Sequence, residues 1–167
     1  MVAPDTAPAV EAAAQAPAAL TAAPGYQVRR LYQAYLAAWL REVDPVLTGP
    51  QFAVLQTVQE CPGRDQRSLA AAVALDTSTM ADVARRLENR RLITRRTAAD
   101  DGRRKLLHLT EEGEQLLRAA DHRARALDRR LMEPFGDTAH QTLLHTLTSL
   151  ADHWVGLADA ATGGQNP

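Results

Sequence analysis

The sequence predicts a mainly α-helical fold with one small β-hairpin, and three observations support this prediction. Apolar residues recur at three- and four-residue spacing through most of residues 26–160, which is the period of an amphipathic helix. One pair of short strand-like stretches stands at residues 92–97 and 105–109, with the turn-forming Asp101-Gly102 between them. Hydroxyl or carboxylate side chains precede most of the helical stretches, where they can accept hydrogen bonds from the first free N–H groups of a helix.

The first predicted helix covers residues 26–43, within an N-terminal dimerisation segment at 25–47. Residues 1–24 contain eleven alanines and four prolines but few large apolar side chains, so we expect a disordered tail there. Aromatic and aliphatic residues then take helical spacing, and Asp44-Pro45 ends the helix.

Three shorter helices and the hairpin are predicted within residues 48–110. Thr48 caps the second helix, with a glutamine three residues later as in a capping box, and Asp65 caps the third. The fourth begins at Asp76 or Thr77, about three residues after the third, and is polar and cationic on its outer face. This pattern is typical of a helix-turn-helix, and a hairpin directly after it makes the winged variant.

Two longer helices complete the predicted order. Thr110 caps one that runs to Met132, and Asp137 caps the last. We expect residues 111–160 to form C-terminal dimerisation helices, because their apolar stripes exceed what one small winged domain can cover, and residues 161–167 to be a frayed tail.

Charge is concentrated around the hairpin. Residues 85–105 hold nine basic and three acidic side chains, so this stretch carries a formal charge of +6 in a chain whose net charge is −1. Such segregation indicates an anionic partner, although a solvated surface gives the same pattern.

Several classes of protein are not favoured. We find no nucleophile elbow, phosphate loop or paired carboxylates, so we predict no enzyme and no cofactor. The five histidines show no i,i+4 pair, and we predict no metal site. Cys61 is the single cysteine, and the N-terminus has no secretory signal pattern, so we expect a cytoplasmic protein.

Three stretches resemble successive signatures of the MarR family of regulators: LTGPQFAVLQTV, STMADVARRLENRRLITR and DDGRRKLLHLTEEG. The resemblance covers about residues 26–157 and is most specific at Asp101, Arg103 and the following Leu-Thr-x-x-Gly. It implies a homodimeric winged-helix protein that binds palindromic double-stranded DNA, usually represses, and releases DNA when a small aromatic acid binds.

Two positions depart from the family pattern. Arg91 stands where the family has a glycine, at a position typical of a left-handed C-cap, so Arg91 is strained there or the helix ends differently. Asp82 stands where many members carry a basic residue. The DNA bases that this chain contacts are therefore expected to differ from those contacted by other members of the family.

The predicted DNA contacts fall into two groups. Those of the recognition helix are Thr77, Ser78, Asp82, Arg85 and Arg86. Those of the wing are Arg95, Arg96, Asp101, Arg103, Arg104 and Lys105. Arg103 is predicted to enter the minor groove, while Arg104 and Lys105 contact phosphates. Thr77 and Ser78 are also suited to simple capping.

An effector site is predicted on the first helix, where aromatic side chains follow two cations. Its residues are Arg29, Arg30, Tyr32, Tyr35 and Trp39. They suit an aromatic carboxylate, and they also suit the core of a dimer interface. Two other functions stay open: a helical interaction module whose basic stretch binds an acidic partner, and a redox-responsive regulator that uses Cys61.

Overall fold

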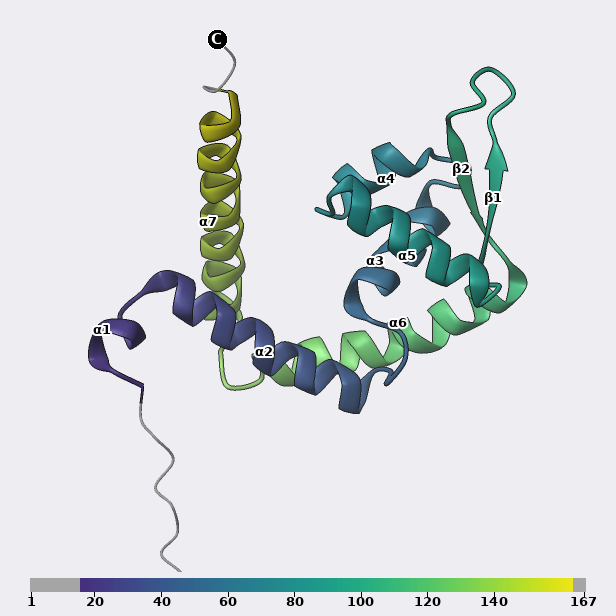
Figure 1. Ribbon diagram of the computed structural model, residues 1–167. Helices are drawn as coiled ribbons and strands as arrows, with labels where there is room; N and C mark the ends of the chain where they lie inside the picture. Colours follow the sequence, from purple (N-terminus) through teal and green to yellow (C-terminus); the bar gives the residue numbers. More distant parts are fainter. Residues whose placement is uncertain (1–15, 164–167) are drawn as a thin grey trace, which may run out of the picture. The chain divides into compact units, whose positions relative to one another are not determined.

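The computed structural model describes residues 16–163 and shows a mostly helical chain with one antiparallel hairpin, as the sequence predicted (Figure 1). The chain divides into two compact units, residues 1–37 and 38–167. The helices and strands are α1 (Ala18–Thr21), α2 (Pro24–Glu42), α3 (Gly49–Glu60), α4 (Gln66–Ala72), α5 (Thr77–Asn89), β1 (Ile93–Thr97), β2 (Lys105–Leu109), α6 (Glu111–Met132) and α7 (Asp137–Gly163).

The two ends of the chain differ from the prediction. Of the expected tail, residues 1–15 lie outside the described residues, but 16–24 contain α1 and the first residue of α2. Pro24 opens α2, because proline at the first helical position has a suitable φ and needs no hydrogen-bond acceptor. At the other end α7 continues to Gly163, into the predicted frayed segment.

The predicted caps stand before α3, α4, α5 and α6. Thr48 forms the full capping box with Gln51, and Asp65, Asp76 and Thr110 each accept a hydrogen bond from a backbone N–H three residues on. The prediction for Asp137 is wrong by one residue. It is the first residue of α7, and the Gly136 carbonyl accepts the hydrogen bond from the His140 N–H.

The core of the second unit lies where α3, α5, α6 and the hairpin meet. Its side chains of lowest exposure come from all of these elements and include Leu55, Met80, Leu87, Ile93, Leu107 and Leu117. Trp39 belongs to this core: it packs against Phe52 at 5.1 Å between ring centroids and donates to the Leu47 carbonyl at 2.6 Å. Within this core α5 packs directly against β1 of the hairpin (Figure 1).

A third backbone segment joins the hairpin. Beyond the register from Ile93 opposite Leu109 to Thr97 opposite Lys105, Asp65 pairs with Leu106 as an isolated bridge. The Gly63 N–H donates to the Leu107 carbonyl at 2.9 Å. The residues directly before α4 are therefore bonded to the wing through the main chain.

In both helices of the helix-turn-helix, the second residue after the helix end is a non-glycine residue in the left-handed region. Ala74 has φ of 52° and Arg91 has φ of 58°. After α5 the Leu92 N–H donates to the Leu87 carbonyl at 3.0 Å, as in a Schellman motif. The family's C-cap geometry is thus kept although its glycine is absent.

Arg91→Gly is expected to leave the free energy of unfolding unchanged or raise it by up to about 1 kcal/mol, since glycine relieves the strain but makes the unfolded chain more flexible. Arg91→Ala is the control, because it removes the arginine side chain and keeps the positive φ. The measurement is equilibrium denaturation. A loss above about 1 kcal/mol for the glycine variant would show that contacts of Arg91 outweigh the strain.

Candidate nucleic-acid interface

The outer face of α5 carries a line of hydrogen-bonding side chains. Met80, Val83, Ala84 and Leu87 bury the inner face. At helical spacing the positions opposite them are Ser78, Asp82, Arg85 and Asn89, and all four are exposed. Asn89 was not among the predicted residues, although its spacing of i+4 from Arg85 places it on the same line.

The N-terminus of α5 is capped by Asp76, one of the two predicted positions. Its carboxylate accepts from the Thr79 N–H at 2.8 Å and from the Ser78 hydroxyl at 2.5 Å. The Ser78 and Thr79 hydrogen bonds hold the pKa of Asp76 well below its usual range. The cap therefore stabilises α5 fully at pH values above the ordinary aspartate pKa. This stabilisation is lost only as the pH falls through the lowered pKa of Asp76. Thr77 is the first helical residue and remains exposed.

The charged residues of α5 are not equivalent. Asp82 accepts from Arg85 Nη2 at 2.7 Å, and both side chains are about 60% exposed. Arg86 is exposed beside this pair, in the last turn. No ion pair to Arg86 is found among residues 16–163.

The predicted turn of the wing is present, and Asp101 holds it through the backbone. The Arg103 N–H donates to the Asp101 carboxylate at 2.9 Å, and the Arg104 N–H donates to the Asp101 carbonyl at 3.0 Å. Asp101 thus binds no guanidinium within the described part of the chain. The tip of the hairpin is a compact turn that carries the Arg103 side chain.

Three cations of the wing differ in their partners. The Arg104 guanidinium lies 2.9 Å from Asp100 and 4.0 Å from Asp65. Lys105 Nζ donates to the Thr97 hydroxyl at 2.8 Å. For the Arg103 guanidinium, the described residues supply no ion pair, so this charge is available to a partner.

Arg95 has a structural contact at the base of the wing. Its guanidinium donates through Nε and Nη2 to Glu88, and both side chains are only about one-third exposed. The pair joins β1 to α5. Arg96, its neighbour in the strand, is exposed. Arg95 is therefore less available to a partner than the sequence suggested, while a DNA contact of the exposed Arg96 stays a prediction.

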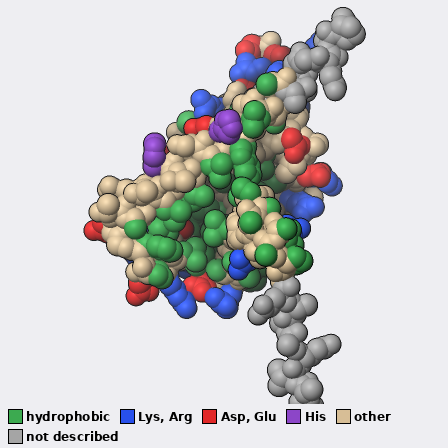
Figure 2. Space-filling view, turned by 90° about the vertical axis from the view of Figure 1, so that its left-hand side faces the viewer, with side chains coloured by type: hydrophobic (Ala, Val, Ile, Leu, Met, Phe, Trp, Pro, Cys, Tyr) green, Lys and Arg blue, Asp and Glu red, His purple; other side chains and the backbone are tan. Residues whose placement is uncertain are grey.

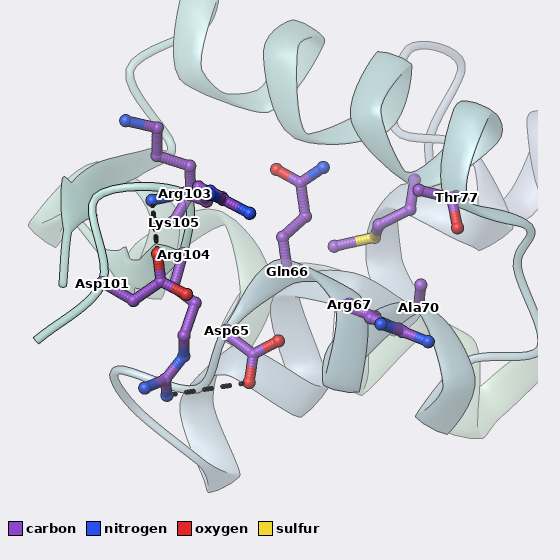
Figure 3. Close-up of a pocket in the computed structure, with 10 residues that line it drawn as sticks. Asp65, Gln66, Arg67, Ala70, Thr77, Asp101, Arg103, Arg104 and Lys105 are labelled. Carbon is purple, nitrogen blue, oxygen red and sulfur yellow. Dashed lines mark hydrogen bonds and ion pairs between the residues drawn. The ribbon is translucent and has the colours of Figure 1, made fainter.

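A groove of about 470 Å³ separates the wing from the start of the helix-turn-helix (Figure 3). Its lining residues are Asp65, Gln66, Arg67, Ala70, Thr77, Met80, Asp101, Arg103, Arg104 and Lys105. Four are cations, and Thr77 brings the first turn of α5 to the same groove. Cations and helix N-termini bind phosphate groups. Gln66 and Arg67 were missed, because only the folded structure shows α4 beside the wing.

The predicted effector residues are not held alike. Trp39 is 3% exposed and serves the core described above. Arg29 and Arg30 lie over the Tyr26 ring, at 5.4 and 5.8 Å from its centroid. Tyr32 is half exposed and Tyr35 is partly buried. Trp39 thus presents little surface to a ligand, and the effector role of the other four residues stays a prediction.

Cys61 is the C-cap residue of α3 and is partly buried. Within the described residues, no three His, Cys, Asp or Glu side chains are grouped as a metal site would require. The same part of the chain holds no helix that is long and apolar enough to cross a membrane.

Comparison with known proteins identifies relatives over most of the chain. The MarR family model matches residues 47–105. The transcriptional regulator HosA of Escherichia coli O157:H7 is 36% identical over 124 residues, which are 74% of this chain and 82% of HosA.

Two similar solved structures are also transcriptional regulators. PcaV from Streptomyces coelicolor, in complex with its natural ligand, is 35% identical and has a TM-score of 0.79 over 83% of this chain and 98% of PcaV. The repressor CouR, bound to a 23-mer DNA duplex, is 31% identical and has a TM-score of 0.72 over 80% of this chain and 96% of CouR. CouR from Rhodococcus jostii RHA1 has also been solved with p-coumaroyl-CoA. The winged fold, the wing motif and these relatives agree: this chain is a member of the MarR family of transcriptional regulators.

Proposed function

We propose that this protein is a cytoplasmic repressor whose homodimer binds palindromic double-stranded DNA and releases it when a small aromatic acid, or a thioester of one, binds. The observation that carries the proposal is the cationic groove between the helix-turn-helix and the wing (Figure 3). The groove brings the first turn of α5, through Thr77, and the arginine-tipped hairpin to one surface of the domain, and this supports joint binding of duplex DNA by the helix and the wing.

Each element has a distinct task in this proposal. The line from Ser78 to Asn89 enters the major groove, where side chains meet base edges. Arg103 reaches the adjacent minor groove, whose negative potential attracts arginine. Arg67 on α4 and Lys105 on β2, which both line the cationic groove of the protein, bind the phosphates between these contacts.

The test starts from duplexes with a randomised central region. Sequences that the protein enriches are compared with scrambled duplexes and poly-glutamate by fluorescence anisotropy across a salt series. We expect a palindromic motif, and a steep fall of affinity with salt as phosphate-bound counterions are released. Equal binding of poly-glutamate and duplex would favour the acidic-partner function instead.

Dimerisation is proposed because α7 exposes a row of large apolar side chains. Leu144, Leu147, Trp154, Val155 and Leu157 are between 37% and 60% exposed. Apolar side chains also reach the surface over the face drawn in Figure 2. A second copy would cover such a surface, and a two-fold dimer reads two inverted half-sites.

We expect sedimentation to give twice the 18.2 kDa chain mass at micromolar concentration. A variant with Leu144→Glu and Leu147→Glu should shift toward the monomer while its circular dichroism spectrum stays helical, since burying two carboxylates opposes association. An 18.2 kDa species alone for the natural chain would contradict the dimer.

An aromatic effector is proposed because PcaV binds a natural ligand and CouR binds p-coumaroyl-CoA. On this chain, Arg29 or Arg30 would pair with the carboxylate or the thioester's phosphates, and Tyr32 and Tyr35 would contact the ring.

Aromatic acids and their coenzyme A thioesters are therefore expected to lower the anisotropy of a preformed DNA complex. Arg29→Ala and Tyr32→Ala should each raise the effector concentration needed for DNA release by about tenfold, which is the equivalent of one charge-assisted contact. Neither variant should change the affinity for DNA in the absence of effector. Arg41→Ala is the control, because Arg41 lies on the same helix and pairs with Glu42. Release that is unaffected by both variants would place the effector elsewhere.

A further inference from the structure

Asp82 lies near the centre of the exposed line of side chains on α5, which faces away from the core of the second unit. The apolar side chains buried under the helix leave positions 78, 82, 85 and 89 farthest from the domain. When α5 enters the major groove, Asp82 lies between two rows of phosphates. A carboxylate there is repelled by the DNA backbone, so its presence calls for a specific partner.

The one partner that residues 16–163 supply to Asp82 is also on this line. Asp82 accepts from Arg85 at 2.7 Å, and both side chains are about 60% exposed. Exposed ion pairs of this kind contribute little to folding. The pair does, however, hold one edge of the guanidinium, and its remaining N–H groups point away from the carboxylate. Arg85 is therefore oriented before it meets a base.

The chemistry of base edges restricts what Asp82 can accept from. Guanine N7 and O6 and thymine O4 are acceptors, which repel a carboxylate. Adenine offers an amino group with the N7 acceptor beside it, whereas cytosine presents only its N4 amino group in the major groove. Cytosine is the base whose edge suits Asp82 best. Arg85 suits guanine, to which it can donate two hydrogen bonds.

We propose that Asp82 and Arg85 form a base-reading pair: Asp82 accepts from the N4 amino group of a cytosine while Arg85 donates to a guanine in the next base pair. The inference rests on the proposed function and adds the base identity to it. The three-residue offset is about 4.5 Å along the helix, similar to the spacing of successive bases.

A consequence is that Asp82 restrains binding to random DNA. Without the carboxylate, Arg85 is free to turn to a phosphate. Asp82→Ala is expected to bind scrambled duplexes more tightly, with a salt dependence steeper by about one unit of log–log slope.

The test repeats the selection from randomised duplexes with the natural chain, Asp82→Ala and Asp82→Asn. The natural protein should prefer cytosine at one position of each half-site by about fivefold or more, the lower range for one base contact. Asp82→Ala should lose that preference, weaken the neighbouring guanine preference of Arg85, and keep the preferences that neither residue determines. Asp82→Asn should shift it to adenine, to which a carboxamide can bond in a bidentate manner.

Glu114→Ala is the matched control. Glu114 pairs with Arg118 on α6 at 3.6 Å, so this variant makes the same change in net charge outside the helix-turn-helix and wing. It should keep the full motif. If Asp82→Ala enriches the same bases as the natural protein with equal preference, the inference is overturned while the proposed function stands. If the natural protein enriches no duplex, the proposed function fails, and the inference fails with it.

Discussion

Gly113→Ala is expected to destabilise the second unit by about 3 kcal/mol or more, the range of severe overpacking. Gly113 lies in the first turn of α6, and a Cβ atom there would stand 2.0 Å from the Leu92 carbonyl oxygen and 2.9 Å from its carbon. This carbonyl already accepts from the Thr110 N–H at 3.1 Å, and Leu92 is buried. Because both neighbours are backbone, relief requires the start of α6 to move away from the hairpin.

Equilibrium denaturation measures this effect, and Gly49→Ala is its control. Gly49 also lies in the first turn of a helix, but a Cβ atom there meets nothing within 4 Å. The control should change the free energy of unfolding by less than about 1 kcal/mol. Equal stabilities of the two variants would show that α6 and the hairpin do not approach as closely as described.

Arg103→Ala is expected to lower operator affinity by about 1–3 kcal/mol and to leave thermal stability nearly unchanged. Arg103 is at the exposed turn of the wing, where, among the described residues, only its backbone N–H is engaged, by Asp101. Without this charge the protein neutralises about one phosphate fewer, and fewer counterions are released on binding. The slope of log affinity against log salt concentration should therefore flatten by about one unit. Fluorescence anisotropy on operator and scrambled duplexes measures both quantities.

Arg104→Ala provides the comparison within the same turn. Its guanidinium is already paired with Asp100 and lies near Asp65, so the loss in affinity should be smaller and similar for operator and scrambled DNA. Natural affinity and natural salt slope in both variants would mean that the wing does not contact DNA.

The features predicted correctly from the sequence are those that depend on near neighbours in the chain. Thr48, Asp65 and Thr110 cap helices because an acceptor side chain needs only the N–H three residues later. For Arg91 the local motif left two possibilities, a left-handed residue or a different helix end, and the structure has the first, with φ of 58°.

The features that were not predicted depend on contacts between distant residues. The sequence placed Trp39 in an aromatic line, but the carbonyl and ring that bury it belong to Leu47 and Phe52, beyond the end of the helix. Glu88 and Arg95 have opposite charges seven residues apart, and only the packing of β1 beside α5 brings them together. Helix periodicity contains no information about either contact.

The main-chain bonds between residues 63–65 and β2 have a consequence for how a signal can act. Since α4 begins at Gln66, moving the wing relative to the helix-turn-helix would break backbone hydrogen bonds in the sheet. In the proposed function, each protomer therefore offers DNA two contact points at a separation that folding has set. In the proposed dimer, an effector can then change the distance between the two protomers far more easily than the separation of the two contact points within either protomer. A duplex that contains a single half-site should consequently bind with an affinity that the effector does not alter.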